Sequence, residues 1–322
     1  MKKILVIRFS SIGDIVLTTP VLRCLKKQLD VDLHFLTKAS FAGLLENNPY
    51  VDRVHSITKD LDKTLVEQLK AEQFDQVIDL HNNLRTLRLK RALKVPSKSF
   101  PKLNVEKWLL VTFKWRKMPD LHIVDRYMET VKHLGVKNDG EGLDYFIPKS
   151  AEVALSRLPS SHASDYVALV IGGQHATKMM PVKKLVELCE ALKEPVLLLG
   201  GPEDEVRGAQ IAEAIGEKVY NACGKFKLDE SASLLKQSSW VISHDTGLMH
   251  MAAAFKKRIV SVWGNTVPEL GMYPYLPDPK SKIIQVPNLS CRPCSKIGYK
   301  KCPKGHFKCM DHDVNEMLGY SS

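Results

Sequence analysis

Short apolar runs alternate with helical patterns along this chain, and the alternation occurs in two successive series. The first series contains Lys3–Phe9 and Phe74–Leu80, which are mainly apolar, as strands covered on both faces are. The second series restarts at Tyr166–Ile171 and contains Trp240–Ser243. Strands that alternate with helices predict an α/β fold in which each series forms a parallel, doubly wound sheet.

A stretch without clear periodicity, Val136–Ser150, separates the two series and fits a linker because of its glycines and its proline. At 322 residues the chain has ample length for two domains. We expect one Rossmann-like domain over residues 1–150 and a second over residues 151–310, facing each other across a central cleft. Residues 311–322 are expected to form a helix that packs back on the first domain.

The composition excludes several classes of protein. An apolar fraction of 44% and a charged fraction of 26% are those of a globular protein in water. No apolar run reaches the ~20 residues needed to span a bilayer, so we expect the chain to stay in the cytoplasm. The turn Ser10–Asp14 has one glycine and not the G-x-G-x-x-G fingerprint, which disfavours a nicotinamide dehydrogenase.

The formal charge of +11 is concentrated between Arg85 and Lys117, where eleven lysines and arginines accompany a single acidic residue, Glu106. Trp108 and Trp115 lie among them. Basic residues interleaved with tryptophan suit an anionic membrane or an anionic lipid substrate. A solvated basic face on an ordinary helix is an equal alternative. Nucleic acid is not expected, because no nucleic-acid fold signature accompanies the basic residues.

In the second series, two polar loops are suited to hold an anion. The run Trp240–Ser243 leads through Asp245 and Thr246, both strong N-cap residues, into a helical pattern. Such a turn aims free N–H groups and the positive end of a helix dipole at one point, which suits a phosphate. Lys178, which lies before Pro181, could neutralise a diphosphate bound nearby. A helix cap and an exposed lysine are the alternatives.

In the first series, Asp14 lies at the mouth of the first strand–turn–helix. It is either a helix N-cap or a general base, and spacing alone does not separate the two. The polar segment Asp79–Arg85 comes at the end of the strand Phe74–Leu80, where an open α/β sheet places its ligands. Within that segment we favour ligand contact for His81 and Arg85.

Four cysteines lie near the end of the chain: Cys291, Cys294, Cys302 and Cys309. A C-x₂-C pair followed by two further cysteines raises a structural zinc site in a cytosolic protein. The second pair does not have the usual short spacing, so free thiols or a local disulfide stay open as alternatives.

These segments together resemble glycosyltransferase family 9, the lipopolysaccharide heptosyltransferases, which have a GT-B fold. The resemblance covers nearly the whole chain. It is carried by Ile4–Asp14, Asp79–Arg85, Lys178–Pro181, Leu199–Asp204, Ser243–His250 and the C-x₂-C pair. Two departures are visible: Met180 stands where the family more often has tryptophan, and Asn221–Lys225 offers no acidic residue for the nucleotide ribose.

The resemblance implies an inverting, metal-independent glycosyltransferase that needs no cofactor and moves a sugar, in the first place heptose from ADP-heptose, onto the lipopolysaccharide inner core. Asp14 would be the general base and Lys178 would hold the donor phosphates. The donor side would further consist of Gly201, Asp245, Thr246, Gly247, Leu248 and His250. The acceptor side would consist of Gly13, His81, Arg85, Arg88 and Arg126. The acceptor would be phosphorylated lipid A–core, reached by a monomer at the inner face of the inner membrane.

Two other readings of the same residues remain. A nucleotide-sugar epimerase on the same fold would act without an acceptor. A non-catalytic protein that binds anionic lipid or nucleic acid would depend on the basic stretch alone.

Overall fold

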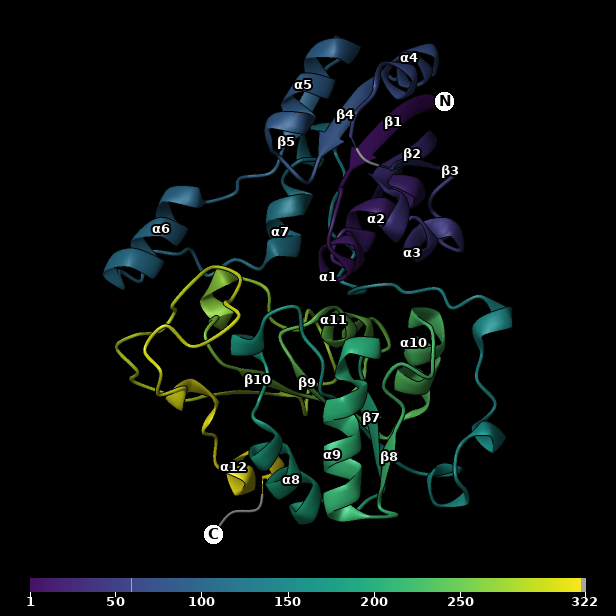
Figure 1. Ribbon diagram of the computed structural model, residues 1–322. Coiled ribbons are helices and arrows are strands. Elements are labelled where there is room, and N and C mark those ends of the chain that lie inside the picture. The colour runs from purple at the N-terminus through teal and green to yellow at the C-terminus, as the bar shows by residue number, and fades with distance from the viewer. Residues whose placement is uncertain (59, 320–322) are drawn as a thin grey trace. The chain divides into compact units, whose positions relative to one another are not determined.

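The computed structural model describes residues 1–58 and 60–319, and the chain divides into two compact units (Figure 1). Unit 1 consists of Met1–Lys102 and Leu121–Phe146, and unit 2 consists of Leu103–Asp120 and Ile147–Ser322. The change of unit after Phe146 lies inside the expected linker. The segment Leu103–Asp120 differs from expectation, because it belongs to unit 2 although unit 1 flanks it in sequence.

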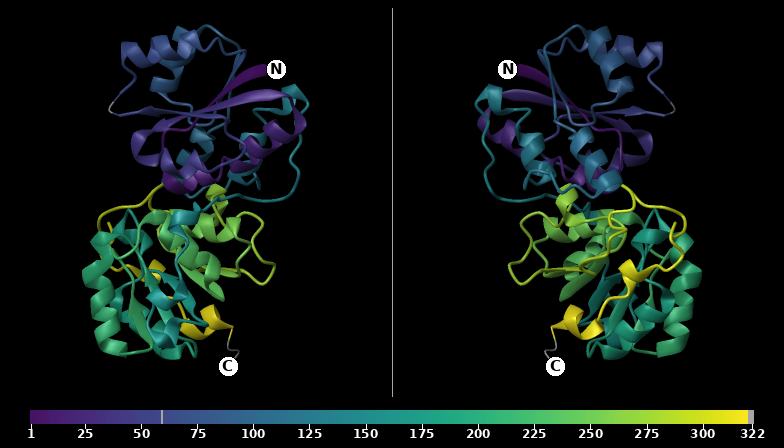
Figure 2. Two further views of the ribbon diagram at one scale, coloured as in Figure 1. Left: turned by 90° about the vertical axis from the view of Figure 1, so that its right-hand side faces the viewer. Right: turned by 90° about the vertical axis from the view of Figure 1, so that its left-hand side faces the viewer.

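Unit 1 is built on a five-stranded parallel sheet with the order β3-β2-β1-β4-β5. Its strands are β1 (Lys2–Ile7), β2 (Val31–Lys38), β3 (Arg53–Ile57), β4 (Gln76–Asp79) and β5 (Ser97–Ser99). Its helices are α1 (Ile12–Val16), α2 (Thr19–Gln28), α3 (Gly43–Glu46), α4 (Lys63–Ala71), α5 (Leu84–Leu93) and α7 (Ile123–Met128). Helices α4 and α5 pack together, as do α2 and α7, so helices cover both faces of the sheet (Figure 2).

Unit 2 is built on a six-stranded parallel sheet with the order β11-β10-β9-β6-β7-β8. Its strands are β6 (Val167–Val170), β7 (Val196–Leu199), β8 (Val219–Asn221), β9 (Trp240–His244), β10 (Ile259–Trp263) and β11 (Lys282–Gln285). Its helices are α6 (Asn104–Phe113), α8 (Val182–Ala191), α9 (Glu205–Ile215), α10 (Leu228–Gln237), α11 (Gly247–Ala254) and α12 (Val314–Leu318). Among the described residues, no helix of either unit is long and apolar enough to cross a membrane.

The last helix, α12, belongs to the core of unit 2. Met317 is fully buried and Leu318 is 8% exposed, and both join a cluster that contains Leu185 and Leu188 of α8. This differs from the expected packing on the first domain. An apolar face of a short helix is stabilised by the nearest complementary surface, and here α8 provides it.

The segment Leu103–Asp120 is attached to unit 2 by apolar and polar contacts. Leu110 of α6 is 1% exposed and packs with Val267 and Leu270. The Nζ of Lys114 donates to the carbonyl of Pro293 at 2.7 Å. Arg116 forms an ion pair with Glu269. The basic stretch read from the sequence is therefore divided between α5 of unit 1 and α6 of unit 2.

Each sheet has one point where the strand order reverses. In unit 1 it lies between β1 and β4, and in unit 2 between β6 and β9. Loops that leave the carboxyl ends of two such neighbouring strands run in opposite directions, and ligands of open α/β sheets bind at the opening between them. These two points contain most of the residues singled out in the sequence.

Candidate active site

In unit 1, Asp14 lies in the first turn after β1, and its carboxylate is bound on both oxygens. Arg8 Nη2 lies 2.6 Å from Asp14 Oδ1. The backbone N–H and the hydroxyl of Ser11 donate to Oδ2 at 3.0 and 2.9 Å. Gly13 is buried in the same turn. Ser11, and not Asp14, is the N-cap residue of α1, and Asp14 at position N3 accepts from the Ser11 N–H as the N3 residue of a capping box does.

The charge of Asp14 is stabilised by its partners. Burial alone would raise the pKa of this carboxyl, but Arg8 and the Ser11 hydrogen bonds outweigh burial and lower the pKa below its ordinary value. Arg8 is itself held in place, since it donates to the carbonyls of Ser10 and Leu80 at 2.8 and 2.6 Å. Asp14 is thus an ionised, oriented carboxylate.

His81 and Arg126 join the surroundings of Arg8. His81 follows β4 and packs against Phe9 with the ring planes tilted by 50° and the centroids 4.9 Å apart. Burial and the charge of Arg8 lower the pKa of His81 to about 4. Arg126 is 1% exposed in α7, and burial lowers its pKa. The neighbouring Tyr127 lies under Arg8, with 5.9 Å from the guanidinium carbon to the ring centre.

The sequence reading missed Arg8, Tyr127 and Lys102. Lys102 has a pKa lowered by burial and by the charge of Arg8, which places it in the same group. Arg8 carries the one available signal: it is a charged residue at the end of an apolar run that becomes a central strand. A buried strand keeps such a residue only with partners for its charge.

The two other expected acceptor residues lie elsewhere in unit 1. Arg85 and Arg88 line a shallow pocket between α4 and α5 that also contains Asp60 and Leu61. Arg85 Nε is 3.5 Å from Asp60 Oδ1. Lys90, on the same helix, is 2.8 Å from the buried Asp79. The helix α5 therefore uses part of its positive charge within the fold.

In unit 2, Lys178 and Asp245 form an ion pair at the reversal point of the sheet. Lys178 Nζ lies 2.6 Å from Asp245 Oδ2, and the side chains are 17% and 10% exposed. The hydroxyl of Thr266 donates to the same oxygen at 3.0 Å. The pair joins the loop after β6 to the loop after β9, and it explains why this lysine is not a free surface residue.

Thr246, and not Asp245, is the N-cap residue of α11. Its side chain makes no capping hydrogen bond to α11; its hydroxyl lies 3.3 Å from the hydroxyl of Ser243. The first N–H groups of α11, which begins at Gly247, are therefore not capped by this side chain. Together with the Lys178 ammonium, they are suited to bind a phosphate.

Two buried histidines lie next to the Lys178–Asp245 pair, at the end of β9 and inside α11. His244 Nε2 accepts a hydrogen bond from the backbone N–H of Met180 at 3.0 Å, and burial lowers the pKa of His244 to about 3. His250 is 2% exposed inside α11, and Leu248 is half-buried beside it. His250 therefore supports the helix from within.

The glycines of unit 2 keep the loop after β7 close to its neighbours. The N–H of Gly201 donates to Asp204 Oδ2 at 3.0 Å. A Cβ on Gly200 would lie 2.7 Å from that oxygen and 2.8 Å from Asp204 Cβ, which no side chain tolerates without movement. Arg207 binds the carbonyl of Met180 and joins this loop to the Lys178 loop.

The predicted zinc site is not supported by the structure. No three of the thiols of Cys291, Cys294, Cys302 and Cys309 converge as ligands of one ion, although all four are described. Cys294 Sγ donates to the carbonyl of Cys291 at 3.1 Å, and Cys291 Sγ lies 3.8 Å from His306 Nε2. The free thiols are the alternative that the structure shows.

Comparison of the sequence with known proteins gives one family and several relatives. The family model described as glycosyltransferase family 9 (heptosyltransferase) matches residues 63–304. Lipopolysaccharide heptosyltransferase 1 of Campylobacter coli is 24% identical over 292 residues, covering 82% of this chain and 84% of that protein. Lipopolysaccharide heptosyltransferase 1 of Escherichia coli K12 is 25% identical, covering 83% and 89%.

The fold also matches solved structures of family 9 glycosyltransferases and heptosyltransferases. A family 9 glycosyltransferase from Veillonella parvula superposes with a TM-score of 0.73 at 22% identity, covering 88% of this chain and 85% of that one. The E. coli heptosyltransferase WaaC with ADP superposes with a TM-score of 0.65 at 25% identity, covering 83% and 88%. The two parallel sheets are those of a GT-B fold.

Proposed function

Because this chain belongs to glycosyltransferase family 9, we propose that it transfers a heptosyl residue from ADP-heptose to the inner core of lipopolysaccharide, with inversion and without a metal. Support comes from the relatives, which are named lipopolysaccharide heptosyltransferases, and from the solved WaaC structure, which contains ADP. The observation that carries the proposal is the arrangement of Lys178, Asp245 and the start of α11 at the reversal point of the unit 2 sheet.

Unit 2 would bind the donor through this arrangement. The leaving diphosphate gains negative charge as the bond to the sugar breaks. The Lys178 ammonium and the first N–H groups of α11 are fixed before that happens, so they stabilise the transition state more than the ground state. Asp245, whose side chain is 10% exposed, would orient Lys178 and contact the donor, together with Gly201, Thr246, Gly247, Leu248 and His250.

Unit 1 would bind the acceptor, with Asp14 as general base. The acceptor hydroxyl oxygen forms a bond to the anomeric carbon, the bond from that carbon to the diphosphate breaks, and the hydroxyl proton moves to the Asp14 carboxylate. Arg8 keeps Asp14 ionised, as this role requires. Gly13 lies in the same turn as the carboxylate, and the charge of Asp14 acts on His81. Both would contact the acceptor together with Arg126, whereas Arg85 and Arg88 would meet more distant phosphates of the acceptor.

The proposal is tested with purified protein, core-truncated lipopolysaccharide and a panel of ADP-, GDP- and UDP-sugars, with release of the nucleotide as the readout. We expect turnover with ADP-heptose and inversion at the anomeric carbon by NMR. Asp14→Asn should abolish transfer and leave the Kd for ADP unchanged, while Asp30→Asn, at an exposed carboxylate, should match the wild type. Near-normal transfer by Asp14→Asn would refute the base assignment. Consumption of the donor without acceptor would favour an epimerase.

Metal independence follows from the proposed charges. Lys178 and α11 supply the positive charge that a divalent cation provides in other transferases. Added Mg²⁺ or Mn²⁺ should therefore leave kcat and KM unchanged. An increase in kcat that saturates with either cation would contradict this part of the proposal.

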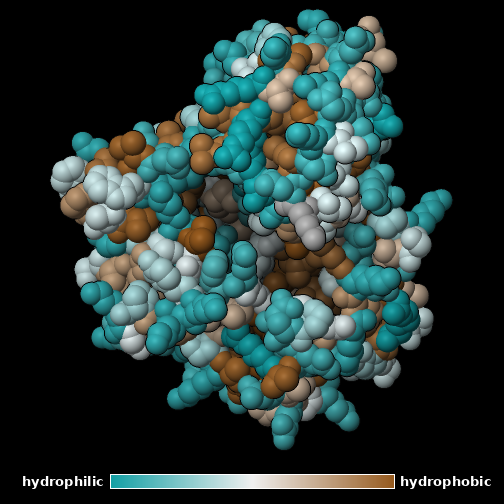
Figure 3. Space-filling model, turned by 45° about the horizontal axis from the view of Figure 1, so that its top comes forward, coloured by the Kyte–Doolittle hydropathy of each residue, from teal (hydrophilic) through white to brown (hydrophobic). Residues whose placement is uncertain are grey.

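The surface of α6 is proposed to touch the anionic membrane that carries the acceptor. Trp108, Phe113 and Trp115 are each about half exposed and form a ring cluster, with centroids 5.1 and 5.6 Å apart. Apolar and hydrophilic residues are interleaved on the surface that carries α6 (Figure 3). Exposed tryptophans beside lysines are suited to the interface between lipid headgroups and acyl chains.

A further inference from the structure

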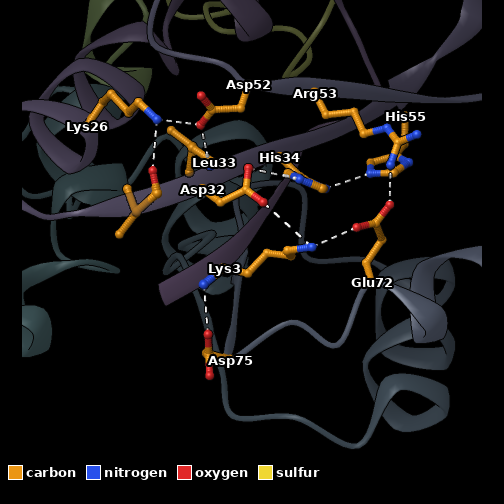
Figure 4. A network of polar contacts seen from close by, with 11 residues as sticks. Lys3, Lys26, Asp32, Leu33, His34, Asp52, Arg53, His55, Glu72 and Asp75 are labelled. Atoms are coloured by element: carbon orange, nitrogen blue, oxygen red, sulfur yellow. Dashed lines mark hydrogen bonds and ion pairs between the residues drawn. The ribbon is translucent and has the colours of Figure 1, made fainter. Parts of the chain in front are cut away.

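Two histidines and a carboxylate converge on the face of the unit 1 sheet that α4 and α5 cover (Figure 4). His34 lies in β2, His55 in the edge strand β3, and Glu72 at the end of α4. One potential ligand atom from each lies within 4.8 Å of the other two. We propose that His34, His55 and Glu72 bind a divalent transition metal, zinc by the chemistry of the donors, at a site separate from Asp14.

The two imidazoles already face each other with the correct nitrogens. His34 Nδ1 lies 2.9 Å from His55 Nε2. Two nitrogens at about 2.0–2.1 Å from a tetrahedral zinc lie roughly 3.3 Å apart. The two rings therefore need to move apart by only a few tenths of an ångström to admit the ion. Two imidazoles with one carboxylate and a water form a common zinc coordination set.

Asp32 fixes the state of His34 that a metal needs. His34 Nε2 lies 3.1 Å from Asp32 Oδ1, so the ring proton sits on Nε2 and the lone pair of Nδ1 points toward His55. A histidine whose second nitrogen donates to a carboxylate is the usual arrangement behind a metal ligand. His34 is only 3% exposed and packs edge-on against Phe74, with the ring centroids 5.2 Å apart, so its ring is held in this orientation.

The third ligand, Glu72, is shared with two cations. Its Oε2 pairs with Lys3 at 2.9 Å, and its other oxygen pairs with Arg53. The Arg53 side chain is 62% exposed, so it can turn into solvent at small cost and release that oxygen. Lys3, Asp32 and Glu72 then leave a net charge of −1 around the ion, which favours a dication.

Such an ion would hold the edge of the sheet. It would add a link between β3, β2 and the end of α4, where β2 and β3 already pair as parallel strands and polar contacts of the network in Figure 4 join them to Glu72. The site lies on a sheet face, between the ends of the strands, and away from the carboxyl ends where Asp14 and His81 lie. Binding of the ion should therefore raise the stability of the fold and leave turnover largely unchanged.

The test is titration of the full chain with Zn²⁺, followed by calorimetry, in wild type and variants. His55→Gln and Glu72→Gln should lose one bound ion per chain or bind it far more weakly. Asp32→Asn should lower the affinity for that ion by about 10- to 100-fold. Asp75→Asn is the control, because Asp75 accepts from the Lys3 backbone in the same network but offers no ligand. All variants keep the four cysteines near the end of the chain, so any Zn²⁺ bound there is the same in each. The difference in Zn²⁺ binding between wild type and variant therefore reports on the histidine site alone.

Arg53→Gln gives a test that misfolding cannot imitate. Removing the cation that competes for Glu72 should tighten Zn²⁺ binding, whereas a damaged fold would weaken it. With Co²⁺, the visible bands lost in His55→Gln should lack the sulfur-to-cobalt charge transfer of thiolate ligands. At a Zn²⁺ concentration of 100 times Kd, the thermal midpoint of the full chain should rise by about 5 °C in the wild type and not in His55→Gln. Equal stoichiometry and affinity in wild type, His55→Gln and Glu72→Gln would overturn the proposal.

Discussion

Replacing Lys178 with methionine removes the ammonium from the centre of the proposed donor site and keeps most of the side-chain volume. In the structure this ammonium lies 2.6 Å from Asp245 Oδ2. The variant therefore affects two quantities at once. It removes a positive charge from the leaving diphosphate, and it leaves the Asp245 carboxylate with the hydroxyl of Thr266, at 3.0 Å, as the partner that the structure still provides for Oδ2.

The two effects have different sizes. A hydrogen bond to a charged group contributes about 1.5–3 kcal/mol, and both side chains are less than one-fifth exposed, so Lys178→Met should lower the free energy of unfolding by about 1–3 kcal/mol. Loss of a fixed donor to developing negative charge costs about 3–4 kcal/mol of barrier. We therefore expect kcat/KM to fall by about 100- to 1,000-fold, together with weaker binding of ADP.

A second substitution separates stability from catalysis. In Lys178→Met/Asp245→Asn the neutral amide no longer needs a cation, so most of the lost stability should return while kcat/KM stays low. Denaturant unfolding gives the first quantity, and steady-state transfer with ADP calorimetry gives the second. If the double variant recovered both, or if Lys178→Met bound ADP as tightly as the wild type, the assignment of Lys178 to the diphosphate would be refuted.

Three further predictions follow from other parts of the structure. Arg8→Gln removes the charge that lowers the pKa of Asp14, so the acid limb of the plot of kcat/KM against pH should move to higher pH. If the acid limb stayed at the same pH, Asp14 would not be the base that titrates there. Trp108→Ser/Trp115→Ser should weaken sedimentation with anionic vesicles without changing the Kd for ADP, whereas Val206→Ser, at another exposed apolar residue of unit 2, should not. His244 has a folded pKa of about 3, below the unfolded value of about 6.5, so the unfolded state binds more protons and stability falls as pH falls below 6.5, with His244 contributing up to about 1.4 kcal/mol per pH unit. His244→Gln should reduce the slope of stability against pH in urea unfolding between pH 6.5 and 5, and His81 with the other buried histidines should account for the slope that remains; an unchanged slope would contradict this role of His244.

Periodicity was sufficient to predict two parallel sheets, because strands buried on both faces leave a clear apolar pattern. Lys3–Phe9 and Trp240–Ser243 correspond closely to β1 (Lys2–Ile7) and β9 (Trp240–His244). The short strands β5 and β8 have only three residues each, and such strands are fixed by pairing with a neighbour and not by their own sequence. The unit to which α6 belongs was equally hidden, since it depends on contacts of Leu110 with residues more than 150 positions away.

The sequence predicted which loops carry the candidate site but not which side chains pair in them. Asp14 was open between a cap and a base, and its decisive neighbour, Arg8, lies in the strand and not in the loop. Asp245 and Thr246 were both candidates for the helix cap; Thr246 occupies the N-cap position, and the Asp245 carboxylate turns to Lys178. Local spacing describes one turn at a time, whereas these partners come from separate turns.

Sheet topology supplies the missing step in such an argument. Lys178 and Asp245 are 67 residues apart, but they follow β6 and β9, which are neighbours in the sheet although not in the sequence. In the same way, Asp14 follows β1 and His81 follows β4, which are paired across the reversal point of unit 1. Once the strand order is known, the loops at each reversal point can be paired before any side chain is placed. If the pairing rather than the loop sequence creates the donor site, moving Lys178 by one residue within its loop should cost as much transfer activity as removing its charge, and a Lys178→Ala/Met179→Lys variant with near-normal kcat/KM would show that the position of the charge matters less than its presence.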